Sequence, residues 1–233
     1  MKKNKAYIIS STKLSGDEQM ALDLNLLNKT ILNEEILYTL RFYFWDGYWL
    51  SIGYHQKKIP SEWLKLSEAG QIKIVRRPSG GGAVLHSGGI TYALTSKKKL
   101  YKEFNYEVIN NWLIESFSKL DINLQKGKIQ KSTIKENCFS SSFTCDLIDD
   151  KGNKRIGSAQ YWKKGSFLQH GEIQLNPPKD LWLSLFKDTP PNALELKINS
   201  NQLIDHLRDN FLKSFNHKET NTIFCSYDQL LKE

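Results

Sequence analysis

The residues best suited to chemistry stand together in one glycine-rich stretch. A short apolar run, residues 72–75, predicts a buried strand, and Arg76 and Arg77 follow it directly. Pro78 favours an extended conformation at Arg77, and the glycines 80–82 leave backbone N–H groups open to a ligand. Arginine offers planar, forked donors to a carboxylate or phosphate. The pattern predicts a pocket for an anion or an acyl carbonyl. The alternative is a flexible hairpin turn, because neither a P-loop nor a GxGxxG spacing is present.

Cys138 is a candidate nucleophile. Its neighbours are polar, whereas Cys145 and Cys225 stand in sequence that suits a small buried hydrophobic residue. A loop thiol near cations ionises more readily and can attack a carbonyl. His86 and His170 each follow a strand-like run, where a histidine is more often a structural hydrogen-bond partner than a catalyst. The cysteines form no CxxC pair and no His/Cys/Asp group has zinc spacing, so no metal is expected.

The stretch RRPSGGGAVLH, with Thr91-Tyr92 after it, resembles the signature loop of the biotin/lipoate protein ligase and octanoyltransferase superfamily. Further blocks of sequence agree in order, so the resemblance extends over roughly residues 17 to 175. These blocks are residues 20–23, residues 41–45 with 51–56, and residues 154–160 with 168–171. The resemblance implies an α+β catalytic domain with a mostly antiparallel sheet and packed helices.

The match is best with the octanoyltransferases that use a Cys-Lys pair. It implies that Cys138 accepts the acyl group and that Lys154 is the catalytic lysine. Arg155 is equally basic, but in an extended strand the two side chains point to opposite faces, and only lysine can lose its proton to become a base. The resemblance also implies a set of substrate-binding residues: Arg76, Arg77, Ser79, Gly80, Gly81, Gly82, His86, Tyr92, Gly157, Ser158, Ala159, His170 and Gly171.

The function implied is octanoyl transfer from an acyl carrier protein thioester to a lysine of lipoyl domains or a glycine-cleavage H-type protein, without a cofactor. One alternative is a lipoate-protein ligase, which forms lipoyl-AMP and needs ATP and Mg²⁺. A second is a non-catalytic domain that binds lipoyl groups or acyl carriers; it stays open because Ser87 replaces the Asp that often follows the histidine in this family.

The composition is that of a globular protein with an excess of positive charge. The chain has 233 residues, 33 Lys and Arg against 25 Asp and Glu, and a formal charge of +8. This balance favours acidic partners, but no nucleic-acid-binding motif is present. No signal sequence or membrane span is expected, and the scattered cysteines favour a reduced, cytoplasmic protein.

Periodicity and turn residues predict the order of elements. We expect a catalytic domain over residues 1–178 and a short helical extension over 179–233. Strands are predicted at 7–9 (an edge strand), 37–45 and 49–54 (a hairpin around Asp46-Gly47), 72–75, 83–86, 90–94, 143–148, 155–162 and 166–175. One helix is predicted from a cap at Ser15 or Asp17 to about Leu32. Further helices are predicted at 60–69, 103–120, 179–186, 201–215 and 227–232, with a mobile loop over 121–137.

Overall fold

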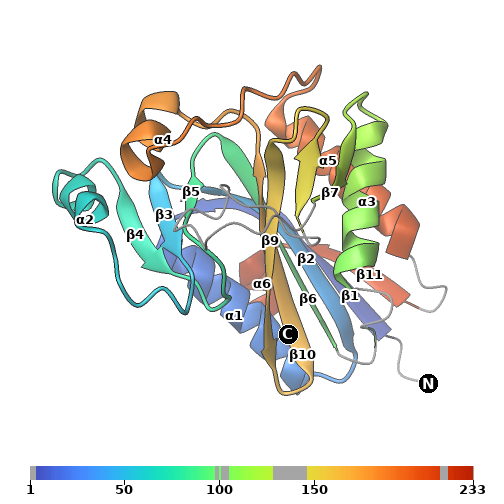
Figure 1. Cartoon of the computed structure of the whole chain (residues 1–233). Coiled ribbons are helices and arrows are strands. Elements are labelled where there is room, and N and C mark those ends of the chain that lie inside the picture. The colour runs from blue at the N-terminus through green and yellow to red at the C-terminus, as the bar shows by residue number, and fades with distance from the viewer. Residues whose placement is uncertain (1–3, 98–99, 101–104, 128–145, 216–219, 233) are drawn as a thin grey trace.

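The computed structural model describes residues 4–97, 100, 105–127, 146–215 and 220–232 (Figure 1). Cys138 and Cys145 therefore lie outside the described residues. The described part is an α+β arrangement of a large sheet, a small sheet and packed helices, and the predicted fold class is confirmed. None of the described helices is long and apolar enough to cross a membrane.

Among the described residues the large sheet has eight strands, and it is mostly antiparallel. β1 is the exception, because it runs parallel to both of its neighbours. The strand predicted at 7–9 is in fact eleven residues long, and it is not an edge strand, since β11 covers its outer side. The spatial order is β11 (Thr220–Cys225), β1 (Asn4–Leu14), β2 (Ile36–Trp45), β6 (Gly89–Lys97), β10 (Ser166–Gln174), β9 (Lys154–Lys163), β8 (Leu147–Asp149) and β7 (Leu124–Lys126).

The small sheet carries the glycine-rich stretch. Its order is β4 (Lys73–Arg76), β3 (Trp49–Ile52) and β5 (Val84–His86), so β3 lies between the two strands that flank the glycines. The predicted hairpin of β2 with β3 is wrong. Gly47 has a φ of +86°, and the chain turns there out of the large sheet into the small one. Both strands are fully or largely buried in separate sheets, which a local turn signal cannot reveal.

Helices cover both faces of the large sheet (Figure 1). On one face, α3 (Tyr106–Ser118) and α5 (Ser200–Phe215) contribute Trp112 and Phe211 to the main core, together with Tyr92 of β6. On the other, α1 (Gly16–Leu32) packs Met20 and Leu27 against strand residues. Ser15 caps α1 through a capping box with Glu18, as its position before an acidic first turn predicts. Strands β10 and β6 are buried on both sides for this reason.

The remaining helices contribute to two smaller cores. α2 (Ser61–Glu68) and α4 (Lys179–Phe186) share a core with the small sheet through Trp63 and Trp182, and α4 has the bounds that the sequence predicts. α6 (Tyr227–Leu231) buries Leu230 beside β1 and α1.

Two strands were not predicted. β11 lies in the part of the chain where only helices were expected, and β7 lies in the part of the predicted 121–137 loop that the structure describes. Both are short. β11 pairs with β1, which is distant in the sequence, and β7 pairs with β8, so each depends on a non-local partner and neither has a strong local signal.

Candidate active site

Arg77 holds the glycine loop, which we define as residues 77–82. Its Nη2 donates to the carbonyls of Gly80 and Gly82, at 2.7 Å each, and its Nη1 donates to the carbonyl and the hydroxyl of Ser51, at 3.1 Å each. Gly81, between the two clamped carbonyls, has a φ of +93°, where glycine is favoured. The loop therefore has a defined shape and is attached to β3.

Arg76 shapes the neighbouring turn in the same manner. Its Nη1 donates to the carbonyls of Gly53 at 2.9 Å and Gln56 at 2.8 Å. Gly53 is required there, because a Cβ atom on it would lie 2.0 Å from the carbonyl oxygen of Gly81. The two arginines were predicted to receive an anion; in this structure they donate to backbone carbonyls and to the Ser51 hydroxyl, and in this way they build the loop. Ligand binding by either guanidinium stays a prediction.

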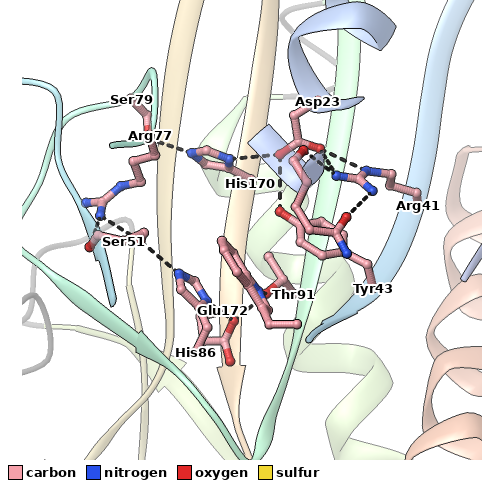
Figure 2. A network of polar contacts seen from close by, with 12 residues as sticks. Asp23, Arg41, Tyr43, Ser51, Arg77, Ser79, His86, Thr91, His170 and Glu172 are labelled. Carbon is pink, nitrogen blue, oxygen red and sulfur yellow. Dashed lines mark hydrogen bonds and ion pairs between the residues drawn. The ribbon is translucent and has the colours of Figure 1, made fainter. Parts of the chain in front are cut away.

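A buried chain of side chains connects the glycine loop to helix α1 (Figure 2). Ser79 Oγ lies 2.5 Å from His170 Nε2, and His170 Nδ1 lies 3.2 Å from Asp23 Oδ2. Asp23 is in turn paired with Arg41, whose Nη2 lies 2.6 Å from Asp23 Oδ1. Ser79 and His170 were both predicted site residues, and the fold brings them into direct contact from positions 91 residues apart.

In this chain the buried charge of Asp23 is compensated by the groups around it. Burial by itself would raise the pKa of Asp23, but the Arg41 charge and the contacts with His170 outweigh burial and lower that pKa. Burial raises the pKa of Tyr43 well above its ordinary value, so the phenol stays protonated and donates to Asp23 Oδ2 at 3.2 Å. Asp23 is thus a carboxylate with several donors around it.

A second buried chain ends on Glu172 of β10. His86 Nδ1 lies 2.8 Å from Glu172 Oε2, and His86 Nε2 lies 2.8 Å from Ser51 Oγ, the hydroxyl that also accepts from Arg77. Trp45 stacks on the His86 ring, with centroids 3.9 Å apart. Burial lowers the pKa of His86 despite the opposing effect of the Glu172 charge, so His86 is a neutral imidazole near pH 7.

Lys154 begins β9 as a buried cation. Its Nζ lies 2.8 Å from Asp146 Oδ2, and only 3% of either side chain is exposed. Asp146 is the first described residue after the undescribed segment 128–145, and its carbonyl accepts from the amide of Gly127 at 2.8 Å. The two ends of that segment therefore lie side by side next to Lys154.

Arg155 points to a different acidic partner, in keeping with strand alternation. Its Nε lies 2.7 Å from Asp149 Oδ2, and its Nη1 donates to the carbonyl of Asn192 at 2.6 Å. Burial would raise the pKa of Asp149, but hydrogen bonds from Asn153 and the Arg155 charge lower it. Arg155 is thus a buried structural cation of the hairpin between β8 and β9.

The predicted residues of β6, β9 and β10 lie in adjacent cross-strand rows. Gly171 pairs with Tyr92 on one side and Ser158 on the other, and Tyr92 Oη lies 2.8 Å from Ser158 Oγ. A Cβ atom on Gly171 would lie 2.5 Å from the Tyr92 ring, so glycine is needed for this contact. Ala159 pairs with His170, and Gly157 pairs with Glu172.

The structure thus brings some of the predicted residues into contact, Ser79 with His170 and Tyr92 with Ser158, but leaves one principal prediction outside its description. The glycine loop contacts His170, and β9 runs beside His170 and carries Lys154 at its start. Cys138 is not among the described residues. Within the described ranges, no group of three or more His, Cys, Asp or Glu side chains is placed to hold a metal ion.

Sequence reasoning missed several polar residues of this region as site residues, and Asp23 and Gln169, which contact His170 and Tyr92, are among them. Ser51, Asp146 and Glu172 each have a buried side chain that contacts a predicted site residue or the arginine clamp. Glu172 carried a usable signal, since it is a charged residue inside a predicted strand, and buried charges are rare unless paired. Asp146 lay within a predicted strand and had a comparable signal.

The sequence has well-matched relatives. Over residues 15–202 the chain matches the family described as the lipoyl protein ligase A/B catalytic domain. The octanoyltransferase LipM of Halalkalibacterium halodurans is 34% identical over 191 residues, which cover 74% of this chain and 68% of the relative. The octanoyltransferase LipM of Anoxybacillus flavithermus is 35% identical over 204 residues, covering 80% of this chain and 71% of the relative.

Solved structures share the fold. A T. acidophilum protein with bound lipoic acid superposes with a TM-score of 0.73 at 18% identity, covering 98% of this chain and 93% of the other. Lipoate-protein ligase A bound with ATP gives 0.68 at 17% identity, covering 99% and 93%. At these identities the likeness concerns the fold alone. Because the family match and the identities above 30% extend over most of the chain, the protein belongs to the lipoyl protein ligase A/B catalytic-domain family.

Proposed function

We propose that this protein is an octanoyltransferase that modifies a lysine of lipoyl domains. The relatives that are 32–35% identical across most of this chain are octanoyltransferases, which supports the activity. The observation that carries the mechanism is the buried Lys154–Asp146 pair at the start of β9. A buried ion pair with such low exposure is costly to desolvate, and such pairs are often retained for function.

The proposed reaction has two acyl transfers. The thiolate of Cys138 attacks the carbonyl of an octanoyl thioester on acyl carrier protein, forming a thioester on Cys138 and releasing the carrier as its thiolate. The ε-amine of the acceptor lysine then attacks that thioester, forms the amide, loses a proton to a base, and releases the Cys138 thiolate. The donor thioester is already activated, so this route needs neither ATP nor Mg²⁺.

In this proposal Lys154 assists both transfers. Cys138 precedes Asp146 by eight residues (146 − 138), and an extended chain of that length spans up to about 27 Å, so the thiol can approach Lys154. An ammonium beside a thiol favours the thiolate and stabilises negative charge that develops on the acyl oxygen. Asp146 compensates the buried charge and orients Lys154.

The partners follow from the two half-reactions. The acceptor is a lipoyl domain, and a neighbour in fold with a TM-score of 0.60 is a bi-partite lipoate protein ligase described together with its E2 lipoyl domain. The donor in this proposal is an acyl carrier protein. The formal charge of +8 favours association with acidic proteins of either kind.

Intact mass after each half-reaction tests the proposal. Wild type mixed with octanoyl carrier protein, without ATP, is expected to gain one octanoyl group and to pass it to a lipoyl domain. Cys138→Ala should gain none, and Cys225→Ala is the matched control that should behave as wild type. Lys154→Arg keeps a cation but cannot accept a proton from the acceptor amine, so we expect it to acylate Cys138 but to transfer very slowly.

The outcomes of this experiment test the covalent route, the ligase alternative and the role of Lys154. Full transfer by Cys138→Ala refutes the covalent route. Transfer that occurs only with free octanoate or lipoate and ATP would instead make the protein a ligase. Normal turnover of Lys154→Arg would reduce the role of Lys154 to electrostatic support.

A further inference from the structure

Glu172 is a buried carboxylate that no sequence pattern assigned to the site. It lies in the middle of β10, and only 3% of the residue is exposed. We propose that Glu172 is a positioning residue: through His86 and Ser51 it holds the Arg77 guanidinium that clamps the glycine loop. Its effect on transfer rests on the proposed function, whereas its effect on the loop does not.

The hydrogen bonds of this chain have one consistent direction. Arg77 can only donate, so Ser51 Oγ accepts from its Nη1 at 3.1 Å. The Ser51 hydroxyl hydrogen is then available for His86 Nε2, 2.8 Å away, which must present a lone pair. His86 therefore carries its hydrogen on Nδ1 and donates to Glu172 Oε2 at 2.8 Å. Glu172 decides which nitrogen of His86 is protonated.

Because the residues of this chain are buried, the nitrogen on which His86 carries its hydrogen affects the contact between Ser51 and Arg77. Ser51 is 1% exposed, Arg77 and His86 are each 6% exposed, and water cannot readily replace a lost partner. If His86 carried its hydrogen on Nε2 instead, that hydrogen and the Arg77 donor would both point at Ser51 Oγ. The hydroxyl hydrogen of Ser51 would then have lost its acceptor on His86, and the contact that orients Arg77 would weaken.

The order serine, histidine, carboxylate also occurs in nucleophilic hydrolases, where the serine attacks substrate. Ser51 is unsuited to that role. It lies inside β3, it is almost fully buried, and its oxygen already accepts from a guanidinium, which lowers its nucleophilicity. The chain therefore transmits position and does not supply a nucleophile.

The clamp determines where the loop presents its N–H groups. In a trans peptide the carbonyl and the following N–H point in opposite directions. Because the carbonyls of Gly80 and Gly82 point at Arg77, the N–H groups of Gly81 and Ala83 point away from it. A displaced guanidinium would release both carbonyls and change the direction of both donors. The chain from Glu172 thus controls the part of the loop where a ligand could meet bare backbone.

The test compares Glu172→Gln with Thr91→Val. Thr91 also donates to Glu172 Oε2 and accepts from Trp45 Nε1, so its removal disturbs the same buried network without changing the partner of His86. We expect Glu172→Gln to shift the ¹⁵N resonances of the His86 ring away from the pure Nδ1–H form and to speed hydrogen exchange at residues 80–83. Thr91→Val should change neither.

Transfer kinetics measure the effect of Glu172 on activity. If the proposed function holds, kcat/KM for octanoyl transfer should fall about 10- to 100-fold in Glu172→Gln, a loss typical of one misplaced buried polar contact. Absence of transfer in wild type would refute the proposed function but leave the exchange and tautomer measurements intact.

A second variant covers the case in which Glu172→Gln does not fold. Ser51→Ala breaks the chain at its other end, so it should speed exchange at residues 80–83 while His86 keeps its Nδ1–H form. Equal exchange rates at these residues in wild type, Ser51→Ala and any folded Glu172→Gln would overturn the proposal. Equal acceleration by Thr91→Val would do the same.

Discussion

Arg41→Met should be among the most destabilising single changes in this protein. The Arg41 and Asp23 side chains have no exposed surface. Arg41 donates from Nε and Nη2 to Asp23 Oδ1, at 2.8 and 2.6 Å, from Nη1 to Gln19 Oε1 at 2.7 Å, and from Nη2 to the carbonyl of Gln19 at 2.9 Å. Methionine fills similar space but leaves all these acceptors without the cation.

The expected cost is about 3–5 kcal/mol of unfolding free energy, the usual result of removing one partner of a buried ion pair. That is a large share of the stability of a typical domain, roughly 5–15 kcal/mol. Urea denaturation followed by tryptophan fluorescence measures it. Arg208→Met is the control, because Arg208 pairs with Asp205 and Asp209 at the surface, where a pair contributes at most about 1 kcal/mol.

The pH dependence gives a second check. In wild type the pKa of Asp23 is lowered by folding, so its contribution to stability is present above the ordinary value of 3.8 and is lost as pH falls through the lowered pKa. Without Arg41, burial would raise that pKa, and acidification would relieve the buried charge. The deficit of Arg41→Met should therefore shrink as the pH falls. A cost no larger than that of Arg208→Met, or a deficit that grows on acidification, would refute this reasoning.

Two further changes test the loop and the β8–β9 hairpin. Gly81→Val should impair binding of the acyl substrate, because the φ of +93° disfavours a β-branched residue and its Cβ would lie 3.0 Å from Arg77 Nη2. Gly70→Val, at a φ of +70° in open space, is the control and should cost comparable stability without changing KM. Equal KM values in the two variants would contradict this prediction. Arg155→Lys should lower unfolding free energy by about 1–3 kcal/mol, because lysine cannot reach Asp149 and the Asn192 carbonyl together, and a melting temperature equal to wild type would argue against the role assigned to Arg155.

The Arg155 prediction differs from what the sequence suggested. Strand alternation correctly indicates that Arg155 points away from Lys154, and by itself it predicts that a change to lysine on that face is tolerated. The structure shows that face to be buried as well, with the carbonyl of Asn192 and the carboxylate of Asp149 against the guanidinium. Alternation gives direction, but it does not reveal what covers each face.

Local sequence determined the elements whose causes are local. The Ser15 cap and Glu18 begin α1, Pro178 precedes α4, and the turn at Asp149–Asn153 joins β8 to β9, each within a few residues of where the pattern places it. Four collinear sequence blocks were also enough to identify the family, which the comparisons confirmed.

The tertiary structure decided which side chains meet. Asp46-Gly47 reads as a hairpin turn, but burial in two different sheets made it a crossing between them. The pair His86 and Glu172 is 86 residues apart, and the pair Ser79 and His170 is 91 apart. No periodicity or turn chemistry encodes such contacts, because they depend on how the strands are ordered and on the register in which they pair. The arginines of the glycine loop likewise carry the same charge in the sequence whether they bind a ligand or their own backbone. Only the packing of β3 between β4 and β5 places Ser51 against Arg77 and the turn that follows β3 against Arg76.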